Sequence, residues 1–186
     1  EESTEIFLPV HTLFLHAILG QYELGAKCAK EKVVKQVKKI QSIGMSYCFV
    51  CFYSGISLYA MARKSGRYKR SANSCRMALH KAVKKGNPNA VHHVKFLDAE
   101  HEALSSRSKA ALDLYQEAIS FAGRLGFLQD VALANERYAQ LLLDSSDPDL
   151  NTDEASFRIQ ESIKYYSEWG AEKKVRLLKD QYADII

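Results

Sequence analysis

The amino-acid sequence predicts an all-α protein, an α-α superhelix built from successive helix pairs. Three observations support this fold class. The chain of 186 residues contains only 3 Pro and 9 Gly, and residues with high helix propensity are frequent. Its hydrophobic content of 47% and charged content of 26% are typical of a globular protein with a sizeable core. Glycines recur at a nearly constant interval after helix-like stretches, as in helical-repeat arrays.

The repeat is defined by four glycines separated by 42, 40 and 44 residues: Gly44, Gly86, Gly126 and Gly170. An apolar residue stands seven positions before each of them. A helix that ends and reverses direction favours glycine, because the last turn is closed by a left-handed backbone conformation. A repeat of about 40 residues accommodates two helices of about 15 to 18 residues and two short turns.

The predicted helices span residues 4–19, 22–42, 46–64, 67–85, 88–105, 108–125, 129–144, 153–169 and 171–184. Asn87 and Pro88 form a cap and a first-turn proline for the fifth helix, and Thr152 caps the eighth after the polar loop 144–151. The helices group into pairs at about 4–42, 46–85, 88–125 and 129–169, plus the terminal helix. We therefore expect one array over residues 1–186, cut from a longer chain.

Apolar stripes justify the later helices individually. The sixth helix carries a narrow stripe with small residues that let paired helices approach closely: Tyr115, Ala118, Ile119 and Ala122. The seventh has an apolar face from Val131 to Leu141, and Asn135, Glu136 and Arg137 begin its other face. These three residues are the candidate interaction surface. Trp169 is expected to anchor the turn at Gly170 by packing over it.

The fifth helix raises the question of a metal site, because it carries His92, His93 and His101. At 100° per residue the three side chains point in different directions, so they cannot converge on one ion from this helix alone. The sequence also lacks a pair of histidines at i and i+4. We interpret them as packing or surface histidines and predict no metal ligand, with a site completed by another segment as the alternative.

Two features of the second and third helices have alternative interpretations. Residues 40–62 carry no charge and are long enough to cross a bilayer, but their polar residues and the register of Gly44 favour a buried repeat helix. Cys48 and Cys51 form a C-x-x-C in a helical, apolar context, which is unlike redox or zinc motifs. We expect buried free thiols and a cytoplasmic location. The amphipathic, basic stretch 27–41 fits an outer helix better than a membrane-surface or calmodulin-type segment.

The formal net charge of +4 is distributed unevenly, with 15 Lys/Arg against 5 Asp/Glu in residues 1–86 and 11 against 17 in residues 87–186. The basic residues are spread over several helices without a recognition motif, so nucleic-acid binding is not expected. Phosphate-loop, dinucleotide-binding, nucleophile-elbow and zinc-protease motifs are absent from the sequence. We therefore expect no catalytic residue and no cofactor.

Three stretches resemble a known family: "GNPNAVHHVKFLDAEHEAL", "ALDLYQEAISFAGRLGFLQDVALANERYAQLLL" and "RIQESIKYYSEWGAEKKVRLLKDQY". The most specific parts are "ALANERYA" at 132–139 and "YSEWGAEKKV" at 166–175. They are similar to the tetratricopeptide-like (TPR-like) helical region that follows the AAA-type ATPase module of large signalling proteins. In that family, kinase-like, GAF, histidine-kinase or nucleotide-cyclase domains accompany the module. The resemblance covers about residues 79–182.

The resemblance implies a non-enzymatic scaffold for protein–protein or interdomain contacts, the regulatory region of a multidomain signal-transduction ATPase or kinase. Its partners would be proteins or neighbouring domains of the same polypeptide. The alternatives are a free-standing TPR-like adaptor that binds peptides or helices and, more distantly, a membrane-associated protein with a span near 40–62. None of the family's nucleotide-binding or phospho-acceptor residues has a counterpart in this chain.

Overall fold

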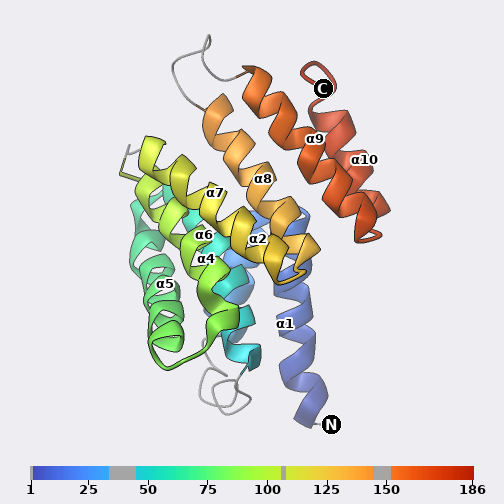
Figure 1. Ribbon diagram of the computed structural model, residues 1–186. Coiled ribbons are helices and arrows are strands. Elements are labelled where there is room, and N and C mark those ends of the chain that lie inside the picture. The colour runs from blue at the N-terminus through green and yellow to red at the C-terminus, as the bar shows by residue number, and fades with distance from the viewer. Residues whose placement is uncertain (1, 34–44, 106–107, 145–151) are drawn as a thin grey trace.

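The computed structural model describes residues 2–33, 45–105, 108–144 and 152–186. This part of the chain is entirely helical and contains no strand, which confirms the all-α class (Figure 1). The helices are α1 (Glu2–Ile18), α2 (Tyr22–Cys28), α4 (Met45–Lys64), α5 (Lys69–Lys84), α6 (Val91–Ala103), α7 (Ser108–Arg124), α8 (Leu128–Leu143), α9 (Thr152–Glu168) and α10 (Glu172–Gln181). Short irregular turns lie at Ala29–Val33, Gly66–Tyr68 and Pro88–Ala90.

The observed helix ends agree with the predicted ones within about three residues for eight of the nine predicted helices. The exception is the predicted helix 22–42. Its first part is α2, which ends at Cys28 and is followed by one π-helical turn at Ala29–Val33. The remainder of that prediction, including Gly44, lies outside the described residues.

Four glycines end helices in the left-handed conformation: Gly20, Gly86, Gly126 and Gly170, with φ of 73°, 90°, 76° and 83°. Gly126 is representative. Its N–H donates to the carbonyl of Gly123, and the N–H of Phe127 donates to the carbonyl of Ala122 at 3.0 Å. This is the Schellman pattern, in which the last carbonyls of the helix are satisfied as the chain reverses. The predicted role of Gly86, Gly126 and Gly170 is therefore confirmed, whereas Gly20 was not predicted.

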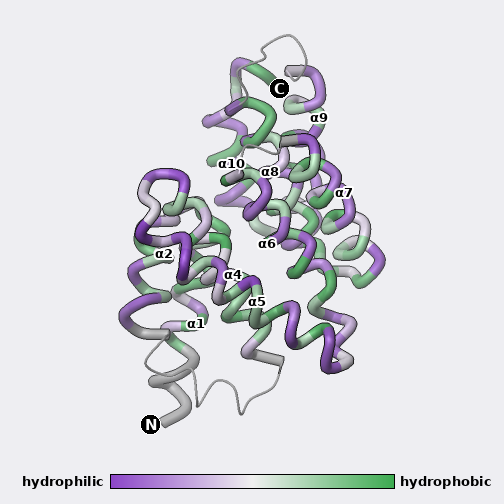
Figure 2. The backbone as a smooth tube through the Cα atoms, turned by 90° about the vertical axis from the view of Figure 1, so that its left-hand side faces the viewer, coloured by the Kyte–Doolittle hydropathy of each residue, from purple (hydrophilic) through white to green (hydrophobic). Residues whose placement is uncertain are grey.

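Consecutive helices pack as neighbours in the pairs α4 with α5, α6 with α7, and α8 with α9 (Figure 1). Their burial differs greatly. We call the first helix of each pair (α4, α6 and α8) inner and the second (α5, α7 and α9) outer. The inner helix α8 buries most of its length, whereas the outer helix α5 buries only Ala72 and Leu79. Along α5 and α7 polar and apolar positions alternate, as expected for helices with one face toward solvent (Figure 2).

The two N-terminal helices cover part of the inner layer. Phe14 of α1 packs edge-on against Tyr53 of α4, with ring centroids 4.9 Å apart, and against Trp169 at the end of α9, at 5.9 Å. Tyr22 of α2 lies against the guanidinium of Arg137 in α8, 5.2 Å from the ring centroid. Segments from both ends of the chain therefore meet over the inner helices.

Helix α4 is surrounded by other helices, and its buried side chains include Phe52, Tyr53, Ile56 and Tyr59. For residues 47–62 this agrees with the predicted buried helix, while residues 40–44 lie outside the described part. None of the described helices is both long enough and apolar enough to cross a membrane. The cysteines are free thiols, with Cys28, Cys48 and Cys51 buried and Cys75 partly exposed.

Candidate functional site

Three carboxylates are buried in the inner layer: Glu100 on α6, and Asp130 and Glu136 on α8, each at most 2% exposed. A carboxylate so far from water needs compensating hydrogen bonds or opposite charges. Each of the three has them, and in each case the partners come from several different helices.

Glu100 joins four helices. Arg137 of α8 binds both of its oxygens, with Nε–Oε1 at 2.6 Å and Nη2–Oε2 at 2.9 Å. Arg63 of α4 approaches Oε2 at 3.2 Å, and the hydroxyl of Tyr115 in α7 donates to Oε1 at 2.6 Å. Burial alone would raise the pKa of Glu100, but the charges of the two arginines outweigh it and lower the pKa to about 2. Glu100 is therefore ionised at neutral pH.

Glu136 has a similar set of partners one helix pair later. Lys174 of α10 donates to Oε1 at 2.8 Å, and the hydroxyl of Tyr166 in α9 donates to Oε2 at 3.3 Å. The same combination thus occurs twice: a glutamate on an inner helix, a tyrosine from its paired outer helix, and a cation from the helix that follows this pair. The cations stand 37 and 38 residues after the glutamates.

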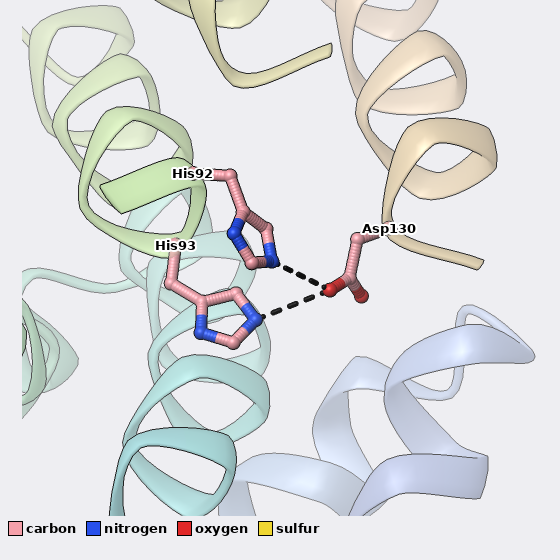
Figure 3. Close-up of side chains that lie close together, drawn as sticks. All are labelled: His92, His93 and Asp130. Carbon is pink, nitrogen blue, oxygen red and sulfur yellow. Dashed lines mark hydrogen bonds and ion pairs between the residues drawn. The ribbon is translucent and has the colours of Figure 1, made fainter. Parts of the chain in front are cut away.

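Asp130 forms the third cluster, shown in Figure 3. The Nε2 atoms of His92 and His93 lie 3.0 Å and 3.1 Å from its Oδ2, and the hydroxyl of Tyr53 donates to Oδ1 at 2.6 Å. The histidines come from the first turn of α6 and Asp130 from the first turn of α8.

Aromatic rings hold both imidazoles in place. His93 stacks on Phe52 with centroids 3.9 Å apart, and His92 stacks on Phe127 at 4.7 Å. Burial lowers the pKa of His93 despite the hydrogen bond to Asp130, so that ring is neutral at pH 7. Burial raises the pKa of Asp130, but the hydrogen bonds from His92 and His93 outweigh this and the net shift is downward. An ionised Asp130 therefore accepts N–H bonds from both rings.

The three residues can also be considered as metal ligands. One nitrogen of each ring and one oxygen of Asp130 lie within 4.8 Å of one another, the only such group of three or more among the described residues. Imidazole and carboxylate are ligands that zinc-class divalent ions accept. Among the described residues the Nδ1 atoms of both histidines have no hydrogen-bond partner.

The burial and stacking of His92 and His93 agree with their interpretation as packing histidines. His101 is separate, with Nδ1 3.3 Å from the hydroxyl of Tyr59, so the three histidines do not gather. His92 and His93 converge on a carboxylate of another helix, which is the geometry that the alternative of a site completed by another segment requires. The predicted absence of metal ligands remains a prediction.

The three residues predicted to form an interaction surface on α8 are buried. Asn135, Glu136 and Arg137 are 2%, 2% and 4% exposed. They were assigned to the polar face of an amphipathic helix, but α2, α6 and α10 cover that face and supply Tyr22, Glu100 and Lys174 as partners. The sequence spacing could have indicated these ion pairs, because Arg137 follows Glu100, and Lys174 follows Glu136, at nearly one repeat length.

An exposed apolar groove lies where α1 meets the turn between α9 and α10. Its volume is about 450 Å³, and its apolar lining is Phe14, Leu15, Ile18, Leu19, Trp169 and Ala171. Leu15 is 54% exposed and Trp169 39%. Trp169 does pack beside the turn at Gly170, against Phe14, but it keeps an exposed edge in the groove. Lys174 lies at the groove and reaches the buried Glu136.

Comparison of the chain with protein-family models, with curated proteins and with solved structures finds no match. The function therefore has to be inferred from the fold, the buried clusters and the groove.

Proposed function

We propose that the chain is a non-enzymatic TPR-like helical-repeat scaffold that binds other protein segments. The observation that carries the proposal is the repetition of one buried arrangement in successive helix pairs. Glu100 with Tyr115 and Arg137, and Glu136 with Tyr166 and Lys174, bring the same combination of residue types together in two successive helix pairs. Chains that stack such units use them as structural supports for binding surfaces.

The groove between α1 and the α9–α10 turn is the proposed binding surface. The inner layer is partly covered by α1 and α2, which makes it less accessible than in an open solenoid. The groove combines the aromatic rings of Phe14 and Trp169 with the half-exposed side chain of Leu15, and such sites serve as anchors at protein interfaces. The apolar face of an amphipathic helix is the partner that best fits these residues.

The biological setting of the proposal rests on the sequence resemblance. It places the chain in the regulatory region of a multidomain signal-transduction ATPase or kinase, where the bound helix would belong to a neighbouring domain. A free-standing adaptor of the same fold would use the same groove for a separate protein. Transcript sequence around this region distinguishes them, since an upstream in-frame phosphate loop is expected only for the multidomain protein.

The groove is tested with a displayed library of amphipathic helical peptides selected on the folded chain. Affinities of the selected peptides are then measured for the wild type, for Leu15→Glu and for Met77→Glu. Met77 is 52% exposed on α5, away from the groove, and provides a matched control. We expect Leu15→Glu to weaken binding by at least about tenfold, since a charge replaces an apolar contact.

The proposed surface would be rejected if the selected peptides bound Leu15→Glu as tightly as the wild type. Selection of no peptide with affinity better than millimolar would reject it as well. Circular dichroism of both variants shows whether the fold is retained, which we expect because both leucine and methionine are exposed at these sites.

A further inference from the structure

The cluster at Asp130 has a feature that a scaffold does not require. Two imidazoles on α6 point their Nε2 atoms toward the same carboxylate oxygen of Asp130 on α8 (Figure 3), and the three ligand atoms lie within 4.8 Å of one another. Each of these two imidazoles also stacks on its own aromatic partner.

The distances match those of a metal centre. Zinc binds imidazole nitrogen and carboxylate oxygen at about 2.0–2.2 Å, so in a tetrahedral site neighbouring ligand atoms are about 3.3 Å apart. The Nε2 atoms of His92 and His93 are 3.0 Å and 3.1 Å from Oδ2 of Asp130. These two separations are close to the tetrahedral value, and all three ligand atoms lie within 4.8 Å of one another.

The surroundings orient the ligands as metal sites require. The hydroxyl of Tyr53 donates to the other oxygen of Asp130 at 2.6 Å, which fixes the carboxylate and leaves Oδ2 for an ion. Phe52 and Phe127 fix the planes of the imidazoles.

We propose that His92, His93 and Asp130 bind one divalent cation of the zinc class, with a fourth position left for a small ligand. Each neutral imidazole would bind through Nε2 and carry its proton on Nδ1, so binding exchanges tautomers without net proton release from the rings. The Nδ1 atoms have no acceptor among the described residues. We therefore expect an affinity about 10- to 100-fold below that of sites with such acceptors.

The proposal is tested on the untagged, metal-free chain with Co²⁺ and Zn²⁺ as probes. Visible absorption reports tetrahedral Co²⁺, and calorimetry with Zn²⁺ gives the stoichiometry. The variants are His93→Gln and Asp130→Asn. The control is His80→Gln, because His80 also pairs with a carboxylate, that of Asp98 at 2.8 Å, but has no second histidine beside it.

We expect the wild type and His80→Gln to bind one ion per chain and to show the tetrahedral Co²⁺ spectrum. In His93→Gln and Asp130→Asn we expect affinity to fall at least about 100-fold and the spectrum to be lost. A wild-type chain that is folded by circular dichroism but gives no Co²⁺ spectrum at millimolar metal overturns the proposal without recourse to variants. Binding that survives both cluster substitutions and is lost in His80→Gln overturns it too.

Discussion

At the scale of single residues, Glu100 illustrates how charge is accommodated in the interior. Its carboxylate is 0% exposed and is bound by two arginines and a tyrosine from three other helices. A buried ion pair stabilises the folded state little more than an apolar pair of similar volume would. Loss of one partner, however, leaves the other charge buried and uncompensated. Replacing one member of this network should therefore lower the free energy of unfolding more than replacing the charged pair together.

Arg137→Met should lower the free energy of unfolding by about 3–5 kcal/mol, because the buried Glu100 would keep the Tyr115 hydroxyl but only one cation, Arg63, at the longer distance of 3.2 Å. Lys95→Met removes an exposed partner of Glu117 and should cost less than about 1 kcal/mol. Urea unfolding gives both values. The double substitution Glu100→Leu with Arg137→Met should cost clearly less than the two single changes added together, and simple additivity would contradict the network.

Stability should depend on pH through Glu100. Its pKa in the folded chain is about 2, against an ordinary value of 4.5. Because the unfolded chain takes up the proton first, the stabilisation is complete above about pH 4.5 and is lost as the pH falls toward 2. The groups facing the carboxylate are Arg63 on α4, Tyr115 on α7 and Arg137 on α8.

Urea unfolding at intervals between pH 6 and pH 3 measures this dependence. In Glu100→Gln the loss of stability between pH 4.5 and pH 3 should be shallower than in the wild type. Equal slopes in the two proteins would show that other carboxylates determine acid unfolding.

At the scale of elements, α4 and α6 approach closely because Gly55 has no side chain. A Cβ atom at this position would lie 2.4 Å from Cδ1 of Leu97, which is fully buried. Gly55→Ala should therefore cost about 1–3 kcal/mol through overpacking. In a Leu97→Ala background the same change should cost nothing or stabilise the protein, since alanine has the higher helix propensity. Thermal unfolding of the four proteins tests this, and equal costs in both backgrounds would refute the proposed contact.

The glycine turns determine where each helix stops. Gly170 has φ of 83°, a conformation that costs other residues about 1 kcal/mol or more. Gly170→Ala should lower the free energy of unfolding by this amount. Gly66→Ala is the control, because a Cβ there meets no atom within 4 Å and its φ is not positive. If both substitutions cost the same in chemical unfolding, the backbone conformation is not the cause.

At the scale of the whole molecule, contact between α1 and the α9–α10 turn joins the two ends of the chain. Trp169, the single tryptophan, reports on this contact through its edge-on packing with Phe14. Phe14→Ala should shift tryptophan emission to longer wavelength and destabilise the protein by roughly 1–3 kcal/mol, since a half-buried ring is removed. Leu8→Ala on the same helix should change stability by less than about 0.5 kcal/mol, as Leu8 is 67% exposed.

Fluorescence and circular dichroism should give coincident unfolding transitions in the wild type, because the junction couples the ends of the array. Separate transitions would show that the N-terminal helices unfold independently. In that case Phe14→Ala would affect only the fluorescence transition.

Much of this architecture is local and was predictable. Helix ends follow from apolar periodicity and from glycines such as Gly86 and Gly126, whose conformation depends on a few neighbouring residues. The buried clusters were not predictable in the same way. The helical wheel of α8 places Arg137 on the face opposite the apolar one, as part of a candidate interaction surface. Only the neighbouring helix α6 supplies the carboxylate that compensates its burial.

The helical class, the order and approximate limits of most helices, and the glycine turns follow from the amino-acid sequence, because these depend on side-chain periodicity and backbone conformation within a few residues. Which polar residues are interior, the meeting of His92 and His93 at Asp130, and the covering of the inner helices by α1 and α2 follow from the packing of the helices. These outcomes depend on residues far apart in the chain, such as His93 with Asp130 and Arg137 with Glu100, each 37 positions apart. Their charges and hydrogen-bonding groups stabilise one another only after the helices have packed.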